Sequence, residues 1–402
     1  MILSALAAIF STLSAMGALF IAFYLYFTER RAPKFIESIK LAESSGQKSL
    51  PFVSIIVTAK NEERVILRCL ASLVEQTYRT LEIVVVDDGS SDRTASIAKE
   101  LGKSDERITL VTAGEKPRGW VGKSWPCQKG SENSRGELLL FVDADSYFDP
   151  KVVELAVGYF QSRQYDMFSI SPKVNLHGTW SHAIMPLLAG AINLLYPMSK
   201  VNDPKKERAY VFGTFILVRR TVYAAIGGHE KVKERLVEDA AIAHLAKSSG
   251  FKLRVERGAE FANTEWETEF GDVFHGLERV FSDSVRLYGV ASILNAALVF
   301  FLGVFPLFVI AGYLYLELVT GANYPLISLP SAAFIACIVS VIALIFTVAN
   351  ELEQISGKIG KHPALYPLGC LIFIFAIITA SVKISRRGAF EWKGSRYSQQ
   401  DE

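Results

Sequence analysis

The chain has 402 residues, with 43 Lys and Arg against 41 Asp and Glu and a formal net charge of +2. Half of the residues are hydrophobic and 21% are charged, below the roughly 25% of an ordinary soluble domain. This composition excludes a disordered chain, and the near-zero net charge argues against a nucleic-acid-binding protein, whose affinity depends on surplus basic residues.

Residues 1–28 are predicted to form an N-terminal transmembrane anchor. No charged residue occurs from Ile2 to Phe27, and about 20 apolar residues are enough for a helix to cross a bilayer. No basic residue precedes this run, as one would in a cleaved signal peptide, and Arg30, Arg31 and Lys34 follow it instead. Because basic residues favour the cytoplasmic side, the chain after residue 28 is expected in the cytoplasm.

Residues 50–285 are predicted to form an α/β domain with a mostly parallel sheet and helices on both faces. Strands are predicted over 53–58, 81–86, 108–111 and 138–142, with helices over 62–76 and 92–101 between them. The strands are nearly continuous apolar runs, which is typical of strands buried on both faces. In such sheets ligands bind at the carboxyl ends of the strands.

Polar side chains gather at three of these strand ends, namely Thr58, Lys60, Glu62, Asp87, Asp88, Asp143 and Asp145. Singly, each has an ordinary explanation, because Asp-Gly is a common turn sequence and two Asp in D-x-D spacing occur by chance. Together they predict a binding site. The pair Asp143 and Asp145 can hold a hard divalent cation, Mg²⁺ or Mn²⁺, which would neutralise a leaving diphosphate.

Two further segments of the domain are predicted to contribute. The glycine-containing basic stretch 116–125 suits a loop that approaches phosphates, with Lys123 as the contact. A carboxylate of the pair Glu238 and Asp239 can take the proton from a hydroxyl acceptor. The alternative for this pair is a charged first turn of a helix, since acidic residues favour that position.

Three other regions are predicted to meet the membrane. Residues 176–200 include an uncharged run with two prolines, and a span there would separate the two halves of the site, so an interfacial helix is expected. Residues 287–384 contain about three apolar segments that could span a bilayer. Three spans after one anchor would put the basic tail, 385–402, outside, against the positive-inside tendency, so one segment could be re-entrant.

The segments VSIIVTAKNEE, EIVVVDDGSSDRT, FVDAD and VEDAAIAHLAKSSG resemble the family-2 glycosyltransferases, inverting enzymes that use nucleotide sugars. The resemblance covers about residues 50–255 and implies a glycosyltransferase A-type fold. It implies that Thr58, Glu62 and Asp88 surround the base and ribose of the nucleotide. With the other strand-end residues Lys60, Asp87 and Asp143, and with Lys123, they make up the predicted nucleotide-sugar site. The resemblance also implies a metal on Asp143 and Asp145 and a general base at Asp239, next to Glu238.

Two shorter motifs resemble one subgroup of that family. The pattern G-W-x-G-K-x-W at 119–125 is similar to enzymes that glycosylate carotenoid acids and to hopanoid-associated proteins. The tail carries a similar W-K-G end, but Ser395 stands where that subgroup has Arg, and Arg396 is displaced by one position. An aromatic and basic interfacial anchor is the alternative for this tail. Candidates for the acceptor or membrane side are His229, Arg279, Trp392 and Arg396.

These observations predict an integral membrane glycosyltransferase with its catalytic domain on the cytoplasmic side. It would move one sugar, with inversion, from a nucleotide diphosphate sugar, with UDP favoured, to a lipid acceptor. A polyprenyl-phosphate glycosyltransferase is the first alternative, because an ionised phosphate needs no base. A processive synthase is less favoured, since only Arg279 remains of its Q-x-x-R-W motif. An inactive membrane scaffold and a transporter are the rivals from other classes.

Overall fold

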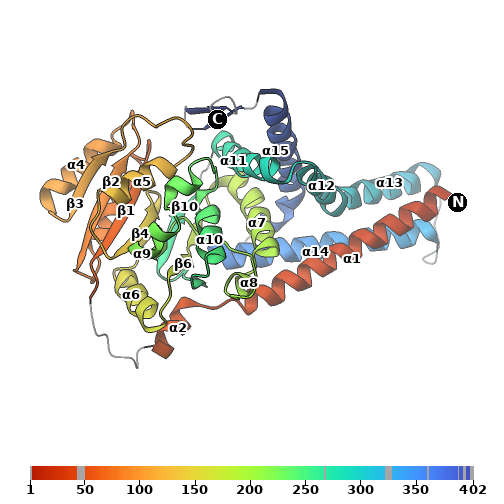
Figure 1. The fold of residues 1–402 in the computed structure, drawn as a ribbon. Coiled ribbons are helices and arrows are strands. Elements are labelled where there is room, and N and C mark those ends of the chain that lie inside the picture. Colours follow the sequence, from red (N-terminus) through yellow and green to blue (C-terminus); the bar gives the residue numbers. More distant parts are fainter. Residues whose placement is uncertain are drawn as a thin grey trace. The chain divides into compact units, whose positions relative to one another are not determined.

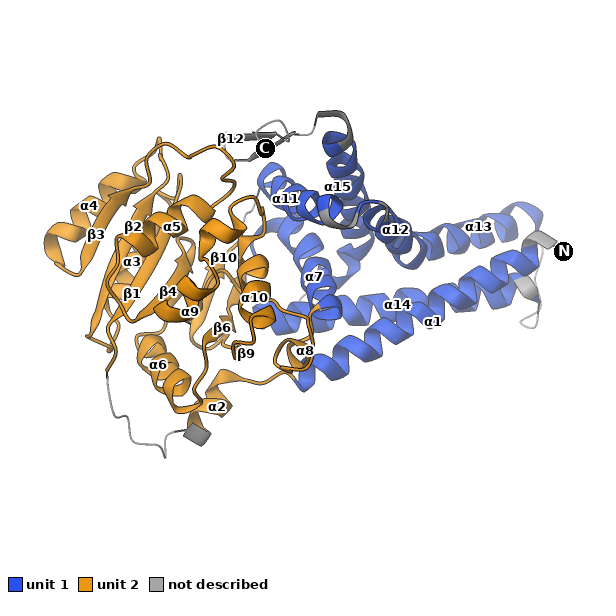
Figure 2. Cartoon of the chain, in the orientation of Figure 1, with its two compact units in different colours: residues 1–31, 176–195, 267–398 blue, residues 32–175, 196–266, 399–402 orange. Residues whose placement is uncertain are grey.

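The computed structural model describes residues 2–42, 50–266, 269–321, 328–359, 362–387, 389–392 and 395–398. The chain divides into two compact units (Figure 2). The α/β unit comprises residues 32–175, 196–266 and 399–402, and the helical unit comprises residues 1–31, 176–195 and 267–398.

The α/β unit is built on a seven-stranded sheet with the order β3-β2-β1-β4-β8-β6-β9 (Figure 1). The strands are β1 (Val53–Ala59), β2 (Leu81–Asp87), β3 (Ile108–Thr112), β4 (Leu138–Asp143), β6 (Met167–Ser171), β8 (Ile216–Arg219) and β9 (Leu253–Arg257). β1 pairs in parallel with β2 and β4, and β2 with β3. Only β8 runs against its two neighbours, β4 and β6. The prediction of a mostly parallel sheet is therefore confirmed.

Helices cover both faces of this sheet. Successive residues of β1 point to opposite faces, so Ile55 and Val57 join one buried cluster and Ile56 joins the other. The first cluster includes residues of α2 (Phe35–Ala42), α3 (Ile66–Val74), α4 (Thr94–Ser104) and α6 (Val152–Ser162). The second includes residues of α5 (Ser124–Glu132), α8 (Met198–Val201), α9 (Arg220–Ala225) and α10 (Glu238–Ser248). A sheet covered on both faces explains why its strands are almost uninterrupted apolar runs.

A second, three-stranded sheet has the order β5-β10-β7. Its strands are β5 (Ser146–Phe148), β7 (Lys173–Asn175) and β10 (Ala262–Glu265), and a short 3-10 helix, η1 (His229–Val232), precedes α10. β5 begins three residues after β4 ends, and the intervening residues are Ala144 and Asp145. The second sheet therefore borders the D-x-D pair.

The helical unit consists mainly of helices that pack on one another, most of them apolar. They are α1 (Ile2–Arg30), α7 (Gly178–Leu195), α11 (Phe270–Tyr288), α12 (Val290–Val299), η2 (Phe300–Val304, a π-helical turn), α13 (Phe305–Thr320), α14 (Leu329–Ser356), η3 (His362–Leu365) and α15 (Tyr366–Arg387). The strands β11 (Ala389–Trp392) and β12 (Ser395–Ser398) form a hairpin.

Five segments of the described chain are long and apolar enough to cross a membrane: 4–30, 178–201, 291–320, 330–356 and 362–384. α1 packs along α14, where Ser14 and Ser340 lie 3.2 Å apart through their hydroxyl oxygens. α7 packs against α15 so closely that a Cβ at Gly369 would collide with the Ala183 carbonyl oxygen. Small residues and hydroxyl contacts of this kind are common between membrane helices.

Candidate functional site

The carboxyl ends of β1, β2 and β4 meet at one edge of the large sheet. In the parallel registers, Thr58 pairs with Asp143 and Ala59 pairs with Asp87. The turn after β1 is joined to the turn after β2, because the Ala59 carbonyl accepts the Asp88 N–H at 2.9 Å. The structure thus brings together the polar strand ends that the sequence predicted to converge.

Asn61 fixes the turn after β1. Its φ of 56° lies in the left-handed region, which Asn tolerates better than most residues. Its amide oxygen accepts the Ser91 N–H at 2.8 Å and its own N–H donates to Ser90 Oγ at 3.0 Å. The next residue, Glu62, donates its N–H to Thr94 Oγ1 at 2.7 Å, and Lys60, which precedes Asn61, is half-buried. This turn holds the predicted nucleotide-contacting residues beside the end of β2.

The two carboxylates at the end of β2, Asp87 as its last residue and Asp88 after it, hold different parts of the site. Asp87 is buried and accepts the Ser90 N–H at 3.3 Å, which shapes the turn. Asp88 Oδ2 lies 3.3 Å from Lys116 Nζ, and Lys116 also donates to the Gly122 carbonyl at 2.6 Å. Lys116 therefore fastens the loop 116–123 to this sheet edge.

Asp145 is held by the second sheet. Its Oδ1 accepts hydrogen bonds from Ser146 Oγ and Thr264 Oγ1, each at 3.2 Å. Burial, together with the nearby charges of Asp143 and Glu62, raises the pKa of Asp145 to about 7. A cation would relieve this repulsion, and carboxylate oxygens are the donors that Mg²⁺ and Mn²⁺ prefer.

The residues around Asp145 fit such a cation only as part of a larger ligand set. Among the described residues, no three His, Cys, Asp or Glu side chains lie close enough to hold a metal by themselves. A cation on Asp143 and Asp145 would take its other ligands from phosphate and water, as Mg²⁺ usually does.

Lys123 links the β4 end to α10. Its Nζ lies 2.7 Å from Asp143 Oδ1 and 3.1 Å from Glu238 Oε1. Burial works against its charge, but Asp143 and Glu238 outweigh burial and hold the pKa of Lys123 well above its usual value. The site thus contains a permanent positive charge contributed by the loop that the sequence predicted to contact phosphates.

Glu238 and Asp239 occupy the first turn of α10 and also reach the site. Both interpretations of this pair are therefore compatible. Asp239 Oδ1 accepts the Ala240 N–H at 2.7 Å. Burial and the adjacent Glu238 raise the pKa of Asp239 to about 6, although Lys123 acts in the opposite direction. A carboxylate with this pKa is ionised at neutral pH and is a stronger base than an exposed Asp.

Sequence reasoning missed Gly213, which lies where the charged groups converge. A Cβ at this position would stand 2.9 Å from Lys123 Nζ, 3.2 Å from Asp239 Oδ2 and 3.3 Å from Asp143 Oδ2. Any side chain at position 213 would push at least one of these three groups from its present position, so glycine is required there. No local signal marks this glycine, because its partners come from distant parts of the chain.

The structure corrects the acceptor-pocket role predicted for His229. Its ring is buried and packs against Phe141 at 5.0 Å, and its Nδ1 lies 2.8 Å from the Tyr223 hydroxyl. Burial lowers the pKa of His229 to about 3, so the ring is neutral. His229 is a core residue behind the site.

The other acceptor-side candidates lie in the helical unit. Arg279 belongs to α11, and Trp392 and Arg396 belong to the hairpin of β11 and β12. The side chains of Trp392 and Arg396 fall outside the described part of the structure. The roles predicted for these three residues stay predictions.

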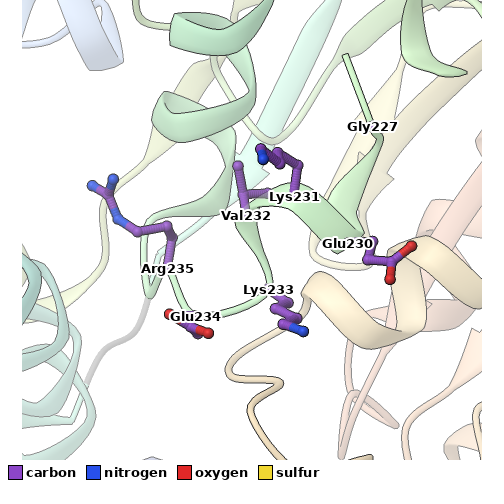
Figure 3. A pocket seen from close by; sticks show the side chains of 7 residues that line it. All are labelled: Gly227, Glu230, Lys231, Val232, Lys233, Glu234 and Arg235. Carbon is purple, nitrogen blue, oxygen red and sulfur yellow. The ribbon is translucent and has the colours of Figure 1, made fainter. Parts of the chain in front are cut away.

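A hollow of about 490 Å³ is lined by Gly227 and residues 230–235, which precede α10 in the chain (Figure 3). Its lining combines the acidic side chains of Glu230 and Glu234 with basic ones. The Val121 N–H donates to the Lys233 carbonyl at 2.7 Å. The loop that carries Lys123 is therefore attached to the segment that leads into Glu238 and Asp239.

The chain is similar to known proteins over its α/β part and beyond. Residues 54–227 match the profile of the family described as glycosyl transferase family 2. A 4,4'-diaponeurosporenoate glycosyltransferase of Staphylococcus haemolyticus (strain JCSC1435) is 28% identical over 192 residues, 46% of this chain and 49% of that protein. The chain thus matches about half the length of this relative. The protein of the same name from Staphylococcus aureus (strain USA300) is 24% identical over 356 residues, 86% of this chain and 88% of that protein.

Among solved structures, the chain is similar to the mannosyltransferase PcManGT from Pyrobaculum calidifontis, determined in complex with GDP-Man and Mn²⁺. The TM-score is 0.51 and the sequence identity 17%, with 95% of this chain and 99% of that chain covered. At this identity the likeness establishes the fold alone.

Proposed function

We propose, from the match of residues 54–227 to the profile of glycosyl transferase family 2, that the protein moves a single sugar to a lipid acceptor at the cytoplasmic face of a membrane. The donor is a nucleotide diphosphate sugar, with uridine as the expected base, and the transfer inverts the anomeric centre. The convergence of Asp143, Lys123 and Asp239 around Gly213 carries the proposal. With the proposed roles, a carboxylate for the cation, a fixed positive charge and a base would surround one point.

The donor would lie along the edge formed by β1, β2 and β4. Thr58, Lys60, Glu62, Asp87 and Asp88 would receive its nucleoside part. Asp143 and Asp145 would hold Mg²⁺ or Mn²⁺, which supplies charge neutralisation for the departing diphosphate. PcManGT was solved with GDP-Man and Mn²⁺, which supports this metal class for the fold. Lys123 would add a second, protein-borne positive charge near the same phosphates.

Asp239 would be the general base. It would accept the proton of the acceptor hydroxyl while the hydroxyl oxygen attacks the anomeric carbon. The bond from that carbon to the diphosphate breaks on the opposite side, which gives inversion. The pKa of about 6 supports this role, because the carboxylate is ionised at neutral pH yet basic enough to take a proton.

A lipid acceptor is supported by the five apolar segments. α7, one of the five, is attached to the α/β unit at both ends. Asn175 precedes it in β7, and Asn202, seven residues after it, exchanges hydrogen bonds of 2.7 and 2.8 Å with Val255 of β9. A helix crossing a hydrocarbon core of about 30 Å would put its ends on opposite sides, so we propose that α7 lies in the interface.

The test uses detergent-solubilised protein, Mn²⁺ or Mg²⁺, and a panel of UDP- and GDP-sugars. Nucleotide release is measured with and without a total lipid extract, and mass spectrometry then identifies the glycosylated lipid. Release that depends on lipid and is lost in Asp145→Ala or with EDTA is expected. If the protein neither releases nor saturably binds any of these nucleotides, the enzyme proposal is wrong and a scaffold role replaces it.

The same assay separates the alternatives. Asp239→Asn abolishes most of the rate if the acceptor is a hydroxyl, whereas a polyprenyl-phosphate acceptor would leave much of it. A ladder of polymeric products would identify a processive synthase.

A further inference from the structure

Two carboxylates from different elements meet at one lysine. Lys123 precedes α5, Asp143 ends β4 and Glu238 begins α10. The Lys123 ammonium lies between the two carboxylates, 2.7 Å from Asp143 and 3.1 Å from Glu238. The Glu238 side chain is only 5% exposed, whereas Asp143 is 30% exposed. One carboxylate of the pair is therefore accessible and the other is enclosed.

The Asp143 carboxylate cannot pair closely with the Lys123 ammonium and bind a divalent cation at the same time. An ammonium 2.7 Å from Asp143 Oδ1 would stand within a few ångströms of any cation bound to that carboxylate, and like charges at that separation repel strongly. Binding of a cation therefore requires Lys123 to move away from Asp143. Glu238 stays available as an enclosed partner, and Gly213 has no side chain to obstruct the ammonium.

We propose that Lys123 occupies the Asp143 carboxylate until a divalent cation displaces it, and that Glu238 is the positioning residue that then keeps Lys123 in the site. This inference rests on the cation site of the proposed function. The displaced ammonium stays bonded to Glu238 and can turn towards the diphosphate. Lys123 thereby prevents an uncompensated cluster of carboxylates in the empty site and adds its charge to the phosphates when the donor is present.

The two neighbouring acids of α10 have different tasks in this scheme. Glu238 acts on the donor side through Lys123, whereas Asp239 acts on the acceptor proton. The loop attachment supports the coupling, because Val121, two residues before Lys123, donates its N–H to Lys233, five residues before Glu238. Lys123 and Glu238 are thus held together by the backbone as well as by their ion pair.

The test measures Mn²⁺ binding by electron paramagnetic resonance in the full-length protein without nucleotide or lipid. If Lys123 blocks Asp143 in about nine of ten molecules, Lys123→Met should bind Mn²⁺ about tenfold more tightly than the unaltered protein. Lys123→Gln, whose side chain ends in a neutral polar group, should also bind Mn²⁺ more tightly than the unaltered protein. It serves as a second variant in case Lys123→Met does not fold. Thermal melting confirms that both variants are folded.

Lys129→Met is the matched control. Lys129 belongs to α5, the helix that Lys123 precedes, is 28% exposed and pairs with Glu132 of the same helix at 2.9 Å. A change of less than twofold is expected from its removal, since its ion pair lies within α5 and includes no carboxylate of the D-x-D pair. Unchanged or weaker Mn²⁺ binding in both Lys123 variants, or equal tightening in Lys129→Met, would overturn the inference.

Kinetics test the role of Glu238. Glu238→Gln should raise KM for the nucleotide sugar more than it lowers kcat, whereas Asp239→Asn should lower kcat at nearly unchanged donor KM. A loss of kcat alone in Glu238→Gln would contradict the positioning role.

The Asp145→Ala variant separates failure of this inference from failure of the proposed function. If the unaltered protein binds no Mn²⁺, or Asp145→Ala binds it equally well, the cation site itself is wrong, and the inference with it. If Mn²⁺ binding requires Asp145 but its affinity is unchanged in the Lys123 variants, only the inference is wrong.

Discussion

Replacing Gly213 by Ala is the most direct perturbation of the candidate site. The added methyl group would stand 2.9 Å from Lys123 Nζ, 3.2 Å from Asp239 Oδ2 and 3.3 Å from Asp143 Oδ2. The backbone of Gly213 is not in the left-handed region, so alanine introduces no backbone strain there. The methyl group therefore acts on the charged groups and not on the chain conformation.

The size of the effect follows from these distances. Ordinary van der Waals contact between a methyl carbon and an ammonium nitrogen needs about 3.5 Å, so Lys123 Nζ must retreat by about 0.5 Å or more. Because Nζ is the end of a flexible side chain, the cost in unfolding free energy should be about 1 kcal/mol or less. Catalysis is less tolerant, since a misplacement of about 1 Å in an active site can lower the rate about a hundredfold. We expect a large loss of rate with nearly unchanged stability.

Lipid-dependent nucleotide release and thermal melting measure the two quantities in the same preparation. Gly158→Ala in α6 is the control, because a Cβ there meets nothing within 4 Å. It should keep full activity and gain stability by about 0.5–1 kcal/mol, as alanine does in a helix interior. Full activity of Gly213→Ala would refute the convergence of catalytic groups at this point.

Three further predictions concern separate features. The value of kcat/KM should fall as pH decreases through about 6, because the pKa of Asp239 lies there and a protonated base is inactive. Asp239→Asn should lower the rate by about 10²–10⁴, and the rate of this variant should no longer fall between neutral and acidic pH. Tyr223→Phe deletes the partner of the buried His229 ring, so the free energy of unfolding should fall by about 1–3 kcal/mol, and an unchanged unfolding midpoint would contradict this contact. Gly369→Val should destabilise the helical unit in detergent by about 1–3 kcal/mol, because its Cβ meets the Ala183 carbonyl, which cannot rotate away; equal melting of this variant and the unaltered protein would argue against the α7–α15 contact.

Much of the candidate site could be predicted because its parts are local. The apolar run 53–58 identified β1, and the polar residues that follow it had to lie at the carboxyl edge of the sheet. The same reasoning placed Asp88 and Asp143 at that edge. Parallel pairing then forces such strand ends together, which the register of Thr58 with Asp143 shows.

Other features depend on segments that meet only after folding. β8 lies antiparallel between β4 and β6, and its four residues give no sign of this placement in the sequence. The sequence makes His229 a candidate for the acceptor side, yet Tyr223 and Phe141 enclose its ring. Burial of a polar side chain depends on what packs over it, and periodicity does not encode that.

The sequence by itself determined the α/β alternation, the apolar segments and the presence of a carboxylate-rich sheet edge, because strand composition and strand-end residues are properties of short stretches. Tertiary structure decided which charges touch. Lys123 and Glu238 are separated by more than a hundred residues, and Gly213 matters only because both Asp143 and Asp239 approach it. Ion pairing requires atoms within about 4 Å, and only the strand order and the loop attachments of the folded chain fix such distances.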